Sequence, residues 1–184
     1  MDFMTAPNLP LENMDERHDG LTSNVAGYYY DAARVCLDRH HSSPIEFALW
    51  NEKEESKTRL EWVPADDKIR RAYANEIDAT EAGACACTIA AVELTKGLVA
   101  VHRAETTTGA DYYVGPVGEK FEDLENCLRL EISGTDKGSS DLVKRRLQEK
   151  VDQALRGNSN LPALAAVIGF QERLIMIKAA EKSP

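Results

Sequence analysis

Apolar residues recur at every second position in some stretches of this chain and at every third or fourth position in others. The first spacing predicts β-strands, whose successive side chains point to opposite faces of a sheet, and the second predicts helices. By this rule the chain contains predicted strands at 45–50, 58–63, 98–104, 110–114, 127–133, 163–170 and 173–179, and predicted helices at 21–41, 64–80, 81–96 and 139–156. Helices and strands are interleaved, which predicts an α/β fold with a mixed central sheet flanked by helices.

The predicted helix at 81–96 differs from the others because it is apolar on nearly all sides. Residues 83–92 are small or apolar and carry no charge, a composition typical of a helix buried against a sheet. We expect Thr80 to cap its start and Gly97 to end it. Glu93 is the first ionisable residue after this stretch. It either emerges into solvent or, if it is buried, needs a partner or a metal ion.

The predicted helix at 139–156 is amphipathic. One side carries an apolar stripe, and the other side carries basic residues that include Lys144, Arg145 and Lys150. Such a face is either a solvated surface or a surface that contacts nucleic-acid phosphates. Acidic residues interspersed among the basic ones favour the solvated surface.

Length and composition indicate a globular protein with one domain. The 184 residues are 43% hydrophobic and 29% charged, which is typical of a folded chain. We expect a single α/β domain at 21–179, made of a helix–hairpin–helix extension at 21–80 and a core at 81–179. Flexible tails are predicted at 1–20 and 180–184.

The charge, the hydropathy and the cysteine content of the chain limit which partners and which cellular location we expect. The net charge of −9 counts against binding nucleic acid by overall electrostatics alone, although a local basic groove remains compatible with it. No run of about 18 apolar residues is present, which predicts no membrane span. The four cysteines have no zinc-site spacing, so we expect free thiols and a cytoplasmic location.

Two acidic residues interrupt the apolar strands in the middle of the chain. Asp111 lies in the strand at 110–114 and Glu131 in the strand at 127–133. Alternation places Glu131 and Ser133 on the polar face of their strand. We therefore expect Asp111 and Glu131 on neighbouring strands, over the polar face of one sheet. The alternatives are that Asp111 is solvated at a turn and that Glu131 is paired with a nearby arginine.

From residue 81 to 179 the order is helix, three strands, helix and two strands, with an acid in the second strand and another in the third. This arrangement resembles the core of the PD-(D/E)xK restriction-endonuclease-like superfamily; the first 80 residues lie outside the resemblance. The resemblance implies a Mg²⁺ ion held by carboxylates, which activates water to attack a phosphodiester. By position, Asp111 matches the first acid, Glu131 the second, and Glu93 a helix acid that sometimes adds a metal contact.

The lysine of that motif is missing from its usual position. The family carries a lysine two residues after the second acid, where this chain has Ser133. A serine hydroxyl has no positive charge and does not replace an ammonium group near a phosphate. Lys137 and Lys144 follow in the next loop and helix, and each is a candidate to supply the missing charge.

Two hypotheses follow from these observations. The first is a Mg²⁺-dependent nuclease that acts on DNA, with Asp111, Glu131 and Ser133 at the catalytic positions; the resemblance implies a role in defence against foreign DNA. The second is a catalytically inactive descendant of the same fold that binds a protein partner or forms a homo-oligomer. The acidity of the chain, the missing lysine and the three tyrosines at 28–30 favour the second hypothesis.

Overall fold

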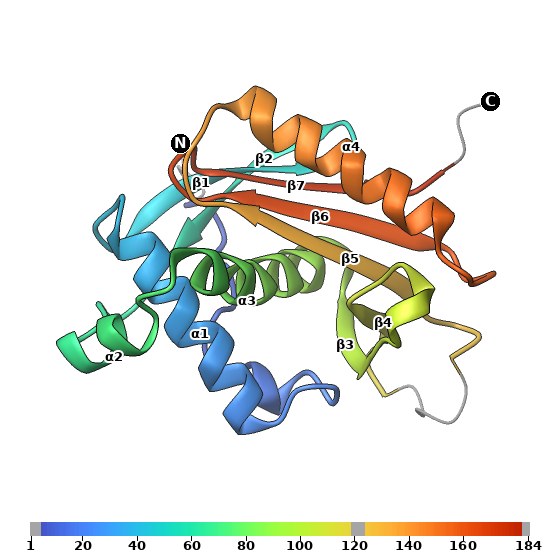
Figure 1. Cartoon of the computed structure of the whole chain (residues 1–184), viewed down its shortest axis with the longest axis horizontal. Coiled ribbons are helices and arrows are strands. Elements are labelled where there is room, and N and C mark those ends of the chain that lie inside the picture. Colours follow the sequence, from blue (N-terminus) through green and yellow to red (C-terminus); the bar gives the residue numbers. More distant parts are fainter. Residues whose placement is uncertain (1–4, 119–123, 182–184) are drawn as a thin grey trace.

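The computed structural model describes residues 5–118 and 124–181, and these residues form a seven-stranded mixed sheet with helices on both faces (Figure 1). The helices are α1 (Ser23–Asp38), α2 (Asp67–Ala72), α3 (Glu76–Lys96) and α4 (Ser140–Arg156). The strands are β1 (Ile45–Asn51), β2 (Glu54–Leu60), β3 (Leu98–Arg103), β4 (Tyr112–Pro116), β5 (Leu128–Thr135), β6 (Ala163–Gly169) and β7 (Leu174–Ala179). The predicted α/β class, with a mixed sheet flanked by helices, is confirmed.

The strand order across the sheet is β2-β1-β7-β6-β5-β4-β3. Strands β3, β4 and β5 form an antiparallel meander, and α4 then crosses over to β6, which runs parallel to β5. Strand β7 returns antiparallel to β6, and β1 pairs with β7 in parallel. The predicted N-terminal extension therefore continues the same sheet beyond β7.

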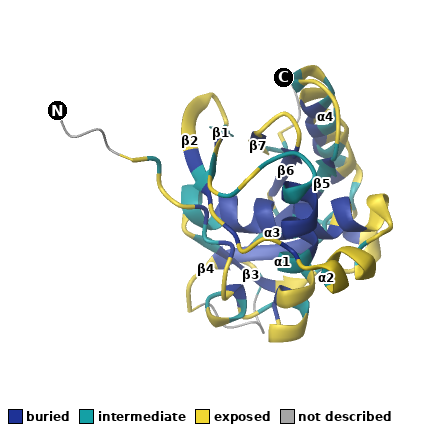
Figure 2. Ribbon diagram, turned by 90° about the vertical axis from the view of Figure 1, so that its left-hand side faces the viewer, coloured by how far each residue is buried: buried dark blue, intermediate teal, exposed yellow. Residues whose placement is uncertain are grey.

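Helices α1 and α3 cover one face of the sheet and α4 covers the other (Figure 1). Helix α3 is the most buried of them, as its composition predicts (Figure 2). Its small residues let α1 approach closely: a Cβ atom added to Gly83 would lie 3.1 Å from the backbone of Ala33. Despite this apolar character, none of the helices in the described part of the chain has the length and hydropathy to cross a membrane.

Helix α3 begins earlier than the sequence predicts. Asn75, rather than Thr80, is its N-cap, and the Asn75 side chain accepts hydrogen bonds from the N–H groups of Ile77 and Asp78. The Thr80 hydroxyl instead donates to the Glu76 carbonyl oxygen one turn earlier. Ile77, which the prediction placed in the preceding helix at 64–80, belongs to the first turn of α3 and is 71% exposed. The early start adds more than one turn to α3.

The second strand of the N-terminal hairpin is also displaced from its predicted position. Strand β2 spans Glu54–Leu60 rather than 58–63, and a tight turn at residues 52–53 joins it to β1. Its first half is charged because β2 is an edge strand whose side chains face solvent. Trp62 lies beyond the strand and is buried, and its indole N–H donates to Asp38 at 2.7 Å.

The prediction of a flexible N-terminal tail is wrong for its described residues, from 5 onward. Leu9, Leu11 and Met14 are buried in the main core. The Leu9 N–H donates to the Arg59 carbonyl oxygen at 2.8 Å, so the segment runs along β2. Widely spaced apolar anchors hold this segment, and such anchors have no helical or strand period. Residues 1–4 and 182–184 of the two predicted tails lie outside the described residues.

His18, near the end of this segment, is fully buried against α3. Its Nδ1 atom accepts a hydrogen bond from the Ala100 N–H at 2.9 Å, so Nε2 carries the hydrogen that points to Glu93 at 2.7 Å. Burial lowers the pKa of His18 despite the hydrogen bond with Glu93, and burial likewise lowers the pKa of His41. Both side chains therefore resist protonation in the folded state.

We expect the free energy of unfolding to fall as pH drops below about 6.5, the ordinary pKa of histidine. The unfolded chain takes up these protons at a higher pH than the folded chain, so acidification favours unfolding until the folded pKa values are passed. Urea denaturation at pH 7.5 and 5.5 measures the effect. The decline should be smaller in His18→Gln and unchanged in His102→Gln, which alters an exposed histidine. An equal decline in His18→Gln and the unsubstituted protein would contradict this origin.

Candidate functional site

A gap in the sheet opens at the first residue of β4, beyond which β5 has no partner strand on that side. Strand β5 pairs with β6 over residues 129–135, but it pairs with β4 only over residues 128–130. Asp111 lies at this point, directly before β4. Its N–H donates to the Leu130 carbonyl oxygen, and its Oδ2 atom accepts from the Ile132 N–H, both at 2.8 Å. The Asp111 carboxylate thus binds the edge of β5 where β4 no longer does.

Glu131 lies next to this gap, on the face of the sheet that α4 covers. The antiparallel register ends at the pair of Tyr112 with Leu130, and the Asp111 N–H also donates to Leu130, so Asp111 lies near Glu131 but outside the regular ladder. Glu131 is only 3% exposed. Burial raises its pKa, the hydrogen bond from Lys150 lowers it, and the nearby charge of Asp111 raises it again, with a net increase.

Lys150 of α4 is the lysine that pairs with Glu131. Its Nζ atom lies 2.7 Å from Glu131 Oε1 and 3.1 Å from Gln153 Oε1, and its side chain is only 20% exposed. We predicted Lys150 as part of a nucleic-acid-binding surface and considered Lys137 and Lys144 for the missing charge. The structure instead places Lys137 beside Glu76 and leaves Lys144 exposed.

A cavity of about 380 Å³ lies against the gap. Its lining comes from five elements of the fold and from the residue before β4: Tyr28 and Tyr29 of α1, Asp78, Glu81, Ala82 and Cys85 of α3, Arg103 of β3, Asp111, Ile132 and Ser133 of β5, and Lys150 of α4. Glu131 is not part of this lining, but it accepts a hydrogen bond from Lys150, which is part of it. A second cavity, of about 530 Å³, shares Glu81, Ser133 and Lys150 with the first and extends to the start of α4.

Glu93, the helix acid that we predicted for the site, does not line this cavity. Glu93 lies near the C-terminal end of α3, where Arg17 and His18 bind its two carboxylate oxygens at 2.7 Å each. The acids of α3 that line the cavity are Asp78 and Glu81. Both lie in the part of α3 near its start, three to four turns before Glu93. The prediction failed because it started the helix at residue 81 and looked for an acid only after the apolar stretch.

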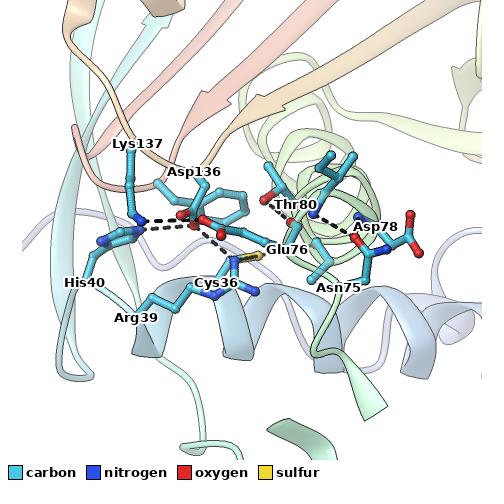
Figure 3. Close-up of polar contacts among 12 residues, drawn as sticks. Cys36, Arg39, His40, Asn75, Glu76, Asp78, Thr80, Asp136 and Lys137 are labelled. Carbon is cyan, nitrogen blue, oxygen red and sulfur yellow. Dashed lines mark hydrogen bonds and ion pairs between the residues drawn. The ribbon is translucent and has the colours of Figure 1, made fainter. Parts of the chain in front are cut away.

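A polar network fixes the start of α3 next to the end of β5 (Figure 3). Asp136, directly after β5, accepts from Arg39 and lies within hydrogen-bonding distance of His40, both at 3.1 Å. Lys137 pairs with Glu76, the first residue of α3. The network therefore joins α1, α3 and the β5–α4 connection, and it holds Glu81 beside Ser133 in the cavities that they share.

Arg103 is the second cation of the site. Its Nη1 atom donates to the Asp111 carbonyl oxygen at 3.0 Å and lies 3.7 Å from Asp111 Oδ1. The guanidinium group also packs over the ring of Tyr112. The Arg103 side chain is 57% exposed, so it remains available to an anionic ligand.

Cys85 does not qualify as a nucleophile, although it lines the cavity. Burial raises the pKa of its thiol to about 12, so the reactive thiolate is scarce at neutral pH. All four cysteines are free thiols, as predicted.

The oxygen atoms of the site fit a hard divalent cation. Within the described ranges, no group of three or more His, Cys, Asp or Glu side chains has the arrangement of a metal site. However, Mg²⁺ needs only one or two protein carboxylates and keeps several waters. Asp111 and Glu131 provide two carboxylates. The Ile132 carbonyl oxygen points to the same strand edge as its N–H, toward Asp111, because both groups of a strand residue point the same way.

Comparisons with protein-family models, with curated proteins and with solved structures found no match.

Proposed function

We propose that this protein is a Mg²⁺-dependent nuclease that acts on DNA phosphodiesters and has a core of the PD-(D/E)xK type. The observation that carries the proposal is the convergence of Asp111, Glu131 and Lys150 at one gap in the sheet, beside a solvent-accessible cavity. The three side chains are far apart in sequence: Asp111 precedes β4, Glu131 belongs to β5, and Lys150 belongs to α4. The strand order and directions of β3 to β6 also agree with that core.

In the proposed reaction, Asp111, Glu131 and the Ile132 carbonyl oxygen would hold the metal ion. When bound, Mg²⁺ polarises a phosphoryl oxygen and makes a coordinated water more acidic. Lys150 has two tasks. It keeps the buried Glu131 carboxylate ionised, and its one remaining N–H group donates to a phosphate oxygen as negative charge develops there. Arg103 binds an adjacent phosphate at the open side of the cavity.

Calorimetric titration with Mg²⁺ and Mn²⁺ tests the metal site directly. We expect one ion to bind to the unsubstituted protein in a saturable way. The affinity of Glu131→Gln for the ion should be at least about tenfold lower, because this variant lacks one charged ligand. Cleavage of labelled single-stranded and double-stranded DNA is measured in parallel, with EDTA as the control. Cleavage that requires the metal and declines in Glu131→Gln supports the nuclease.

The ion pairs of the site also favour a second candidate function. Lys150 at 2.7 Å and Arg103 at 3.7 Å already offset the charges of Glu131 and Asp111 without a metal. If the titration detects no ion binding and no DNA is cleaved, the nuclease proposal is wrong. The second candidate, a catalytically inactive subunit that binds protein, then predicts a stable complex, which light scattering after size-exclusion chromatography detects.

A further inference from the structure

Part of the wall of the cavity is aromatic. Tyr28 and Tyr29, consecutive residues of α1, both line it together with Asp111 and Lys150. Tyr28 is 49% exposed, which is unusual for a large ring that packs against other rings. A half-exposed aromatic side chain in the wall of a polar cavity offers a flat face on which a planar ligand can stack.

The Tyr28 ring is held in place by its neighbours. Its centroid lies 5.4 Å from that of Tyr73 and 6.0 Å from that of Tyr29. The Tyr73 hydroxyl donates to the Tyr28 carbonyl oxygen at 2.9 Å, and the Tyr29 and Tyr112 hydroxyls are joined at 2.7 Å. A ring that is oriented before binding loses little conformational entropy when a flat ligand stacks on it.

We infer that Tyr28 stacks on an unpaired nucleobase, so that the substrate is single-stranded nucleic acid or a strand with a base displaced from its stack. The inference rests on the proposed function, because the phosphate next to that base would lie at Asp111, Glu131 and Lys150. Bases inside a duplex are covered on both faces by their neighbours and do not offer a free face to Tyr28. A cavity of about 380 Å³ also matches a ligand of nucleotide size rather than a duplex.

The charges around the cavity agree with recognition of a base rather than of a long phosphate backbone. Asp78 and Glu81 line the α3 wall; carboxylates repel phosphates but accept hydrogen bonds from base amino groups. Arg103 and Lys150 are the cations of the lining, and the whole chain carries a net charge of −9. Few phosphates are therefore neutralised, and the affinity should depend only weakly on salt concentration.

The test measures the binding of labelled 12-nucleotide strands by fluorescence anisotropy. Ca²⁺ replaces Mg²⁺ in the buffer, so that binding is measured separately from cleavage. The probes are a single strand, the corresponding duplex and a strand of the same length without bases. We expect the single strand to bind at least about tenfold more tightly than the duplex or the abasic strand, because stacking of one base on an aromatic ring has about this effect or more. Tyr28→Leu should remove the preference, and Tyr28→Phe should keep it.

Tyr30→Leu is the matched control, because it makes the same change two residues along α1, where the side chain lines a different pocket. It should leave binding unchanged, and circular dichroism verifies that each variant is folded. Equal affinity for the single strand and the duplex, or an unchanged preference in Tyr28→Leu, would overturn the inference. Failure of the nuclease proposal is visible separately, as absence of Mg²⁺-dependent cleavage while the Tyr28-dependent binding persists.

Discussion

Replacing Asp111 with Asn should lower the rate of Mg²⁺-dependent DNA cleavage roughly a thousandfold, which is the scale of losing one main electrostatic contribution to a transition state. The Asn side chain still offers Oδ1, so the hydrogen bond from the Ile132 N–H that closes the edge of β5 is retained. The substitution therefore removes the negative charge and leaves the local fold in place. Single-turnover cleavage at saturating Mg²⁺ measures the rate.

The matched control is Asp152→Asn, on the solvent-exposed side of α4, which should cleave DNA at the same rate as the unsubstituted protein. Thermal unfolding of both variants should stay close to that of the parent protein. A cleavage rate in Asp111→Asn within about threefold of the parent rate would exclude Asp111 from the site. If both variants lose activity together, the loss reflects a general effect of charge rather than the proposed site.

Local patterns in the sequence were sufficient to predict the mixed sheet and most of its strands. Alternation along β5 correctly separates Leu130 and Ile132, which join the main core, from Glu131 and Ser133 on the other face. Gly97 ends α3 in a left-handed conformation with φ of 65°, as a C-cap glycine does. These features depend on period and on backbone conformation, which neighbouring residues determine.

The features that the sequence did not reveal depend on contacts between distant segments. Glu81 lies inside α3 rather than at its first residue, because the helix begins after Asn75. Asn75 and Thr80 are both suitable N-cap residues, and the structure uses Asn75. A lysine beside Glu131 was expected to be Lys137 or Lys144, whereas α4 brings Lys150 to Glu131 from 19 residues away. One signal was present: Lys150 continues the helical spacing of Val143, Leu147 and Ala154, which all face the core.

Lys150→Met should destabilise the protein by about 3 kcal/mol near neutral pH, because it leaves the Glu131 carboxylate buried without its partner. The loss should shrink on acidification. Burial holds the pKa of Glu131 above its ordinary value, and loss of the lysine raises that pKa further. A carboxyl group with a raised pKa favours the folded state below its unfolded pKa of about 4.3 and loses this contribution as pH rises through the folded value. Urea denaturation of the variant and the parent between pH 4.5 and 8 measures the difference.

Two further variants separate the charge of Lys150 from its packing. Lys150→Arg keeps a cation and should retain most of the stability. Lys150→Met combined with Glu131→Gln removes both charges, so the pH dependence that originates at Glu131 should be absent from its stability. A pH-independent loss in Lys150→Met alone would show that Glu131 is not the group left without a partner.

Cleavage by Lys150→Met should be restored in part by Ser133→Lys. Ser133 lies two residues after Glu131, so its side chain emerges on the same face of β5, and it lines the same cavity as Lys150. A lysine there returns an ammonium group to the position where the PD-(D/E)xK motif carries it. If cleavage depends on an ammonium charge at this place and not on its coming from α4, the double variant should cleave at least about tenfold faster than Lys150→Met. This gain equals roughly 1.4 kcal/mol in transition-state stabilisation. Ser133→Met in the same background is the control for side-chain length without charge, and equal rates for the two double variants would show that Lys150 does not act through its ammonium group.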